Sequence, residues 1–151
     1  LKDTCEEFLK RYGSNMQGLF VYGDATSKKQ DTKLQKGQNF YLLIKGYLSK
    51  LKPTFRIPKA NPSVIMSRNF TNDLLSGSID GLSIGFDAKC RNSINDYQYC
   101  TEDAEGKVNK KLVRDKVTGR SWQEFGHASD CLRYILTAMF GDYYKKFMKG
   151  S

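Results

Sequence analysis

The sequence predicts an α/β fold in which helices flank a largely parallel central sheet. Apolar runs of strand length alternate with amphipathic segments of helix length along most of the chain. The first of these runs, 19–22, ends in Gly23-Asp24, as a strand does when it delivers an acidic side chain to the edge of a sheet. A long amphipathic segment closes the chain. Alternation of this kind builds a layered α/β domain.

The first third of the chain predicts two helices separated by one strand. Residues 3–12 carry apolar side chains at helical spacing and stop at a glycine. The apolar run 19–22 has the length of a strand, and the lysine-rich stretch 25–37 holds few apolar residues, as a loop does. Apolar residues return at helical spacing over 39–51, and Pro53 closes that segment.

The middle third continues the alternation. A short strand is expected over 54–57. Asn61-Pro62 then opens a helix that stops near Gly77, because asparagine caps helices well and proline is tolerated at the first helical position. Residues 82–87 alternate strictly between apolar and other side chains, the pattern of a half-buried strand.

The last third predicts a short helix over 90–99, a β-hairpin over 101–125 and a final helix over 128–146. Both Glu105-Gly106 and Thr118-Gly119 are turn signals, so the tip of the hairpin has two candidates. No repeat or linker interrupts the chain, which indicates one domain over 1–151. The chain begins without methionine, so we expect it to be cut from a longer protein.

The charge balance predicts a polyanionic partner. The net charge is +9 and the isoelectric point is about 9.4. Six basic side chains stand against one acidic side chain between 107 and 120. Such clusters neutralise nucleic-acid phosphates, although many small domains are basic only for solubility. The expected DNA contacts are Lys28, Lys29, Lys33, Lys107, Lys110, Lys111 and Arg114.

The composition also bounds the environment of the protein. The longest apolar runs are too short to span a membrane, and no signal peptide opens the chain, so we expect no membrane partner. The four cysteines form no CxxC pair. We expect free and mostly buried thiols in a reducing cytoplasm.

The candidate chemistry centres on Asp24 and Asp130. Asp24 ends the first strand; it is either a metal ligand or an ordinary turn aspartate. Asp130 lies in the first turn of the last helix, where the helix dipole favours an acid without any function, but the small residues 126–129 would let a ligand approach closely. His127, the only histidine, lies three residues before Asp130 and so shares a helix face with it; either an active-site or a structural role is open.

Two acids in a basic protein indicate metal-dependent phosphodiester hydrolysis. Mg²⁺ and Mn²⁺ prefer oxygen ligands and use only one or two carboxylates beside phosphate and water. A third oxygen ligand is expected, with Asp87 and Asn61 as equal candidates. Asn61 follows the strand 54–57, although helix capping is an alternative, and Asp87 ends the strand 82–87.

These residues resemble a known family. The quoted stretches are Val21-Tyr22-Gly23-Asp24-Ala25, Asn61-Pro62-Ser63-Val64, Cys90-Arg91 to Asp96, Gly106-Lys107 to Lys110, and Gly126-His127-Ala128-Ser129-Asp130 to Arg133-Tyr134. They look like the C-terminal nuclease domain of a tailed-bacteriophage large terminase subunit, over about 20–140. The last stretch is the most specific of them.

The resemblance implies an RNase H-like fold and a metal-dependent endonuclease that cuts concatemeric viral DNA. It implies one or two Mg²⁺ or Mn²⁺ ions, with Asp24 as the first-strand acid, Asp130 as the last-helix acid and His127 beside it. It also implies a preceding ATPase domain, partners in the portal protein and the small terminase subunit, and the cytoplasm of an infected bacterium. The chain lacks the family's middle acid over 56–64 and the usual hairpin after the first strand. The alternatives are a junction-resolvase type of RNase H-like nuclease and a non-catalytic DNA-binding or capsid-docking module.

Overall fold

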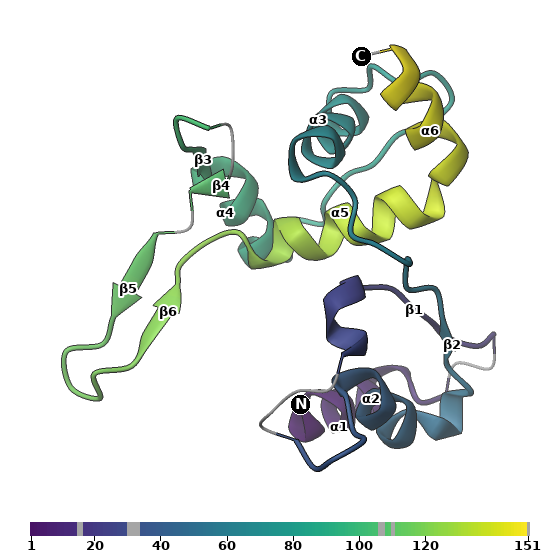
Figure 1. The fold of residues 1–151 in the computed structure, drawn as a ribbon, viewed down its shortest axis with the longest axis vertical. Coiled ribbons are helices and arrows are strands. Elements are labelled where there is room, and N and C mark those ends of the chain that lie inside the picture. Colours follow the sequence, from purple (N-terminus) through teal and green to yellow (C-terminus); the bar gives the residue numbers. More distant parts are fainter. Residues whose placement is uncertain (15–16, 30–33, 106–107, 110, 151) are drawn as a thin grey trace. The chain divides into compact units, whose positions relative to one another are not determined.

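A computed structural model describes residues 1–14, 17–29, 34–105, 108–109 and 111–150 (Figure 1). The chain divides into two compact units, Leu1–Asn61 and Pro62–Ser151. Each unit is described by itself.

The first unit consists of short elements around one pair of parallel strands. Its helices are α1 (Lys2–Tyr12), α2 (Phe40–Tyr47) and the 3-10 turns η1 (Ala25–Lys28) and η2 (Ser49–Leu51). Strands β1 (Phe20–Val21) and β2 (Thr54–Phe55) pair in parallel, with Phe20 opposite Thr54 and Val21 opposite Phe55. Because parallel strands point the same way, the residues that follow them meet at one edge. That edge receives Asp24 and Asn61.

The second unit has a helical core. Helices α3 (Val64–Leu75), α5 (His127–Met139) and α6 (Gly141–Gly150) form it and pack pairwise, and α4 (Arg91–Tyr99) packs against α5 (Figure 1). Its buried residues are Phe70, Leu74, Leu136 and Tyr144. The ring of Phe70 is fully buried and lies 5.2 Å from that of Tyr144, centroid to centroid.

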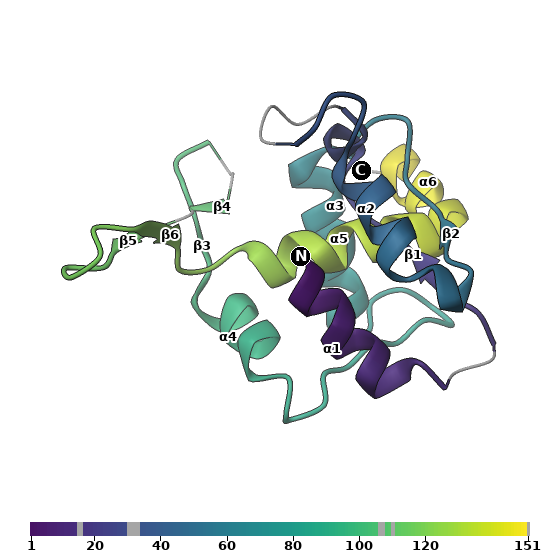
Figure 2. The ribbon, with the colours of Figure 1, turned by 90° about the horizontal axis from the view of Figure 1, so that it is seen from below.

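Two antiparallel hairpins complete the second unit. Strands β3 (Thr101–Glu102) and β4 (Val108–Asn109) form the first, and β5 (Leu112–Arg114) and β6 (Ser121–Gln123) form the second. The single hairpin expected over 101–125 is therefore two hairpins. Thr118-Gly119 lies at the tip of the second, whereas Gly106 of the other turn signal lies outside the described residues. The β5–β6 hairpin extends away from the helices of its unit, as two perpendicular views show (Figures 1 and 2).

The expected RNase H-like fold is wrong. Of the described residues 50% are helix and 10% strand, and the described strands form three separate two-stranded sheets instead of one central, mostly parallel sheet. Only β1 and β2 pair in parallel among the described strands. The physical reason is that the apolar runs 19–22 and 54–57 yield strands of only two residues, too short to support a wide sheet.

The expected strand over 82–87 shows how the pattern misleads. Its alternation is real, since Leu82, Ile84 and Phe86 are half-buried while their neighbours are exposed. However, Leu82 and Ile84 pack against the helical core around Phe70, and this segment is irregular. The long helix expected over 128–146 is also divided, because the backbone at Phe140 leaves helical geometry between α5 and α6.

The four cysteines form no disulfide with one another, and only Cys5 is buried, whereas mostly buried thiols were expected. Cys90 and Cys131 are exposed and Cys100 is half-buried.

Candidate functional site

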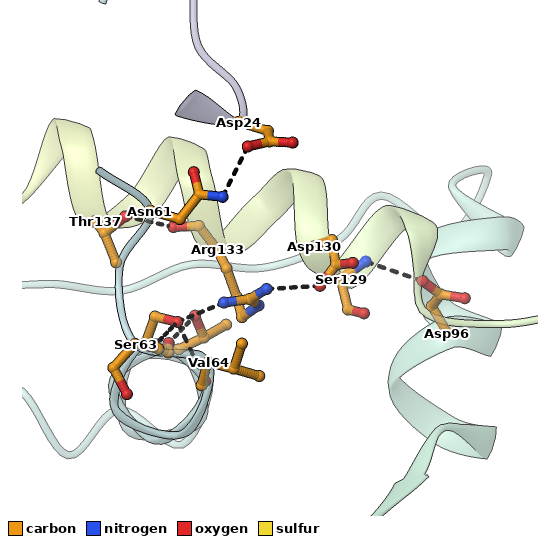
Figure 3. A network of polar contacts seen from close by, with 11 residues as sticks. Asp24, Asn61, Ser63, Val64, Asp96, Ser129, Asp130, Arg133 and Thr137 are labelled. Carbon is orange, nitrogen blue, oxygen red and sulfur yellow. Dashed lines mark hydrogen bonds and ion pairs between the residues drawn. The ribbon is translucent and has the colours of Figure 1, made fainter. Parts of the chain in front are cut away.

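Asp24 lies at the edge where both parallel strands of the first unit end. Its carboxylate caps the 3-10 turn η1 by accepting hydrogen bonds from the backbone N–H and the hydroxyl of Thr26. It also accepts a bond of 2.7 Å from Nδ2 of Asn61 (Figure 3). The turn role considered for Asp24 is therefore present in the structure. The three donors are neutral, and no described lysine or arginine pairs with this carboxylate.

The surroundings of Asp24 keep it ionised. Burial is the largest single influence and raises the pKa of the carboxyl, but the hydrogen bonds from Thr26 and Asn61 together outweigh burial. The pKa therefore lies below its ordinary value. Hydrogen bonds to the charged form of an acid have this effect. The result is a half-buried carboxylate that carries its charge at neutral pH.

Asn61 joins the two strand ends. Its Oδ1 accepts from the backbone N–H of Ala25 at 2.7 Å while its Nδ2 donates to Asp24. Both ends of the amide are engaged, so Asn61 fixes the position of Asp24. The helix cap expected at Asn61 belongs instead to Ser63, whose hydroxyl accepts from the N–H of Met66.

Asp130 lies in the first turn of α5, where the sequence placed it. Its Oδ1 accepts a 2.7 Å bond from Nη2 of Arg133, one turn later on the helix (Figure 3). Nη1 of Arg133 donates to Oγ of Ser67 at 2.6 Å, and that hydroxyl donates to the carbonyl of Ser63. Arg133 is 4% exposed and Ser67 is fully buried. This chain of polar contacts links α5 to α3.

A second buried acid holds the start of α5. Asp96 is 5% exposed, and its two carboxylate oxygens accept from the backbone N–H groups of Gly126 and Ser129, each at 2.9 Å. The first turn of a helix leaves such N–H groups without partners in the helix, and a carboxylate there also meets the favourable end of the dipole. Gly126 takes the left-handed conformation, with φ of 100°, which suits glycine. Asp96 thus fixes where α5 begins.

His127 and Asp87 lie outside these contacts. His127 is exposed at the first residue of α5 and lines an open cleft of about 440 Å³ together with Asn92, Asn95 and Phe125. Asp87 is exposed in a turn, where its carboxylate accepts from the backbone N–H of Lys89. Asp87 therefore closes a turn, and it follows an irregular segment, not a strand.

The β5–β6 hairpin forms an exposed basic ribbon, here called the ribbon, over 111–124. Its turn is ordered by Asp115, which accepts from the backbone N–H groups of Val117 and Thr118 at 2.7 Å. Three exposed cations have no ion pair with any described carboxylate: Arg114, Lys116 and Arg120. Arg114 is braced by a bond from its Nε to the carbonyl of Gly119.

The other expected DNA contacts have different surroundings. Lys111 pairs with Glu124 at 3.5 Å, across the base of the ribbon. Lys28 donates to the carbonyl oxygens of Ile57 and Pro58 and so ties η1 to the segment after β2. Lys29 is exposed. Lys33, Lys107 and Lys110 lie outside the described residues.

A divalent metal fits one of the two principal acids. Ligating carboxylates are commonly held by neutral hydrogen-bond donors, as Asp24 is. Asp130 fits poorly in its present state, because the guanidinium of Arg133 already provides the positive charge next to its oxygen. Within the described ranges, no three His, Cys, Asp or Glu side chains group closely enough to hold a metal.

Arg133, Ser67, Asp96 and Ser129 are the polar residues that sequence reasoning missed. Arg133 had a signal, since an acid and an arginine three apart on a helix are neighbours. Nothing local distinguishes Ser67 or Asp96, whose partners lie 66 and 30 or more residues away.

Within the described part of the chain, the helices are all too short or too polar to cross a membrane. Comparison of the chain with protein-family models, with curated proteins and with solved structures gives no match in any of the three.

Proposed function

We propose that this chain is a DNA-binding endonuclease module that depends on Mg²⁺ or Mn²⁺. The observation that carries the proposal is the state of Asp24. It is an ionised, partly accessible carboxylate held by neutral donors at the shared edge of a parallel strand pair. Magnesium sites in proteins often use only one or two carboxylates, with substrate phosphates and water completing the shell.

Each residue of the Asp24 group has a distinct role in this proposal. Asp24 provides the negative charge that holds the ion, and Thr26 and Asn61 orient its oxygens. A bound divalent ion supplies an activated water and stabilises the leaving oxygen of a phosphodiester. The chain does not have the expected RNase H-like fold, so the fold gives the proposed nuclease activity no support. The support comes from these residues and from the positive net charge of the chain.

The ribbon supports the DNA-binding half of the proposal. A two-stranded ribbon is narrow enough to enter the major groove. The exposed guanidinium and ammonium groups of Arg114, Lys116 and Arg120 are donors of the kind that bind phosphate oxygens. Their contacts with the backbone of duplex DNA carry no sequence preference of their own.

The resemblance to terminase nuclease domains extends the proposal to a biological setting. In that setting the module follows an ATPase domain, works with a portal protein and a small terminase subunit, and cuts concatemeric viral DNA in the bacterial cytoplasm. The resemblance is carried by the short stretches that contain Asp24 and Asp130.

A second candidate is a DNA-binding module without catalytic activity. The observation that favours it is the ion pair of Asp130 with the buried Arg133, which gives Asp130 a structural role that needs no metal.

A plasmid-nicking assay with Mn²⁺ separates the two candidates. The first predicts that Asp24→Asn abolishes nicking while circular dichroism and duplex binding stay as in the wild type. Asp80→Asn is the matched control, since Asp80 is an exposed acid outside the Asp24 group, and it should nick normally. Nicking by Asp24→Asn at the wild-type rate rules out Asp24 as the metal-binding acid. Duplex binding without nicking by the wild type favours the second candidate.

The ribbon is tested by salt dependence. Changing Arg114, Lys116 and Arg120 to alanine should reduce the slope of log K against log salt by up to about three units, because each lost phosphate contact contributes about 0.9. The charge-matched control changes Lys145, Lys146 and Lys149 of α6 and should leave the slope nearly unaltered. Equal effects of the two triple variants would mean that the ribbon is not the contact.

A further inference from the structure

The ribbon exposes the only tryptophan in the sequence. Trp122 lies on β6 and is 48% exposed. The register of the hairpin places it directly opposite Val113, and directly opposite side chains of an antiparallel pair lie on one face. Tryptophan has a large apolar side chain that is mostly buried in folded proteins. Contact of the open indole ring with a partner therefore removes apolar surface from water, which favours binding.

The face of the ribbon that carries Trp122 also carries a guanidinium that is available to a phosphate. Side chains two residues apart on a strand share a face, so the charged neighbours of Trp122 on this face are Lys111, Asp115, Arg120 and Glu124. Glu124 pairs with Lys111 at 3.5 Å, and the carboxylate of Asp115 accepts from two amides of the turn. Arg120 is exposed and has no ion pair with any described carboxylate. This face therefore favours a partner that has both a flat ring and a negative charge.

These two properties occur together in a nucleic-acid strand whose bases are unpaired. In a duplex the flat faces of the bases are stacked on one another, and a protein reaches only the base edges and the backbone. In an unpaired strand each base has an open face, and proteins bind such strands by stacking aromatic side chains on the bases next to cations that follow the phosphates. The exposed indole ring therefore favours an unpaired strand over a duplex.

The ribbon is ordered before any partner binds. Asp115 holds the amides of the turn, and Nε of Arg114 donates to the carbonyl of Gly119 at 3.2 Å. Gly119 takes the left-handed conformation that the turn requires, with φ of 68°. A surface that is ordered in advance loses less conformational entropy on binding.

We propose that the ribbon binds an unpaired DNA strand, with one base stacked on Trp122 and the adjoining phosphates bound by Arg120, Arg114 and Lys116. The choice of DNA rests on the proposed function, which this inference deepens by naming the class of substrate. That class is DNA with a single-stranded segment, such as a gap, a flap or an opened end. Because every base has a flat face, stacking on Trp122 carries no strong sequence preference.

The fluorescence of Trp122 tests the proposal in the whole chain, since the sequence holds no other tryptophan. A short oligothymidylate should quench this fluorescence, because its bases are unpaired and stack on the indole ring. A strand of the same length and charge in which every nucleotide is abasic should bind more weakly and should not quench. Relaxed closed plasmid DNA, whose bases are paired, should bind without quenching.

Variants of Trp122 measure the contribution of the ring, with binding followed by the anisotropy of a labelled oligothymidylate. Trp122→Leu keeps an apolar side chain opposite Val113 but has no flat ring. It should bind about five- to 150-fold more weakly, the equivalent of one base stacked on an aromatic side chain. Trp122→Tyr keeps a ring and should retain most of the affinity. Leu112→Ala is the matched control, because Leu112 is 67% exposed on the opposite face of the ribbon, and it should bind as the wild type does.

Three results overturn the proposal: no quenching by oligothymidylate, an abasic strand that binds equally tightly, or wild-type affinity in Trp122→Leu. The comparison with the abasic strand needs no variant, so it decides the question even if Trp122→Leu does not fold. Duplex binding and nicking without quenching by oligothymidylate overturn this proposal alone. Quenching and oligothymidylate binding without nicking overturn the proposed nuclease activity alone, and failure to bind either DNA overturns both.

Discussion

Replacement of Arg133 by methionine tests whether an internal ion pair holds Asp130. Methionine keeps an apolar stem of similar length, so the change in the free energy of unfolding comes mainly from lost polar contacts. Arg133 is 4% exposed and binds Ser67 at 2.6 Å and Asp130 at 2.7 Å. The variant removes both bonds and leaves the carboxylate without this cation.

The expected loss of stability depends on how far water and the helix dipole can stabilise the Asp130 carboxylate once Arg133 is removed. Removing one partner of a fully buried ion pair costs about 3–5 kcal/mol. The side chain of Asp130 is 23% exposed, and its place in the first turn of α5 is worth about 0.3–1 kcal/mol through the helix dipole. Ser67 keeps its bond to the carbonyl of Ser63. We therefore expect Arg133→Met to lower the free energy of unfolding by about 2–3 kcal/mol.

A double-mutant cycle with Asp130→Asn isolates the pair, read from hydrogen exchange of the α5 amides so that the second unit is followed by itself. A hydrogen-bonded charge pair should give a coupling energy of about 1.5–3 kcal/mol. The exposed pair of Lys145 and Asp142, at 3.4 Å on α6, is the matched control, with an expected coupling below about 0.5 kcal/mol. A coupling for Arg133 and Asp130 as small as in this control would refute the structural role of the pair.

Two further predictions concern the core and the ribbon. Phe70→Ala should destabilise the second unit by about 3–5 kcal/mol in urea unfolding, because Phe70 is fully buried. Leu42→Ala, at an exposed position of the first unit, should destabilise its unit far less. Equal losses of stability in the two variants would contradict the assignment of the core. The pKa of Asp115 is lowered, first by the backbone hydrogen bond from Thr118, so its stabilisation of the turn is complete above the unfolded-state pKa and is lost as the pH falls through the lower folded-state value. Acidification should therefore loosen the turn of the ribbon, which the NMR signals of the amides around Trp122 would report. In Asp115→Asn the turn should be loose already at neutral pH. Signals of this variant that match those of the wild type at both neutral and acidic pH would refute the role of Asp115.

Local signals in the sequence predicted most of the helices. The expected segment 3–12 is α1 within one residue, and 90–99 is α4 within one residue. The first of these helices has clear apolar spacing and a glycine stop at Gly13, so nearest neighbours in the chain decide it. The strand pair was also foreseeable, since both runs before Asp24 and Asn61 form strands and their ends meet as parallel strands require.

The arrangement of these elements could not be predicted in the same way. Alternation over 82–87 shows which side chains are buried, but it does not show whether a strand or a helical core covers them. In this chain the cover is the cluster around Phe70. A sheet also needs several strands to find one another, and each strand of two or three residues offers few hydrogen bonds to secure that pairing.

The start of α5 explains why one stretch of sequence supported two different roles for Asp130. An acid in the first turn of a helix, next to small residues, suits a metal, and it equally suits an arginine one turn later. The spacing alone is the same in both cases. The role of Asp130 depends on whether the arginine side chain is held next to the carboxylate. Ser67 of α3 holds Arg133 there by accepting a hydrogen bond from Nη1 of the guanidinium. Since Ser67 itself is fixed by the carbonyl of Ser63, the environment of Asp130 is set by residues more than sixty positions earlier, beyond the reach of any local pattern.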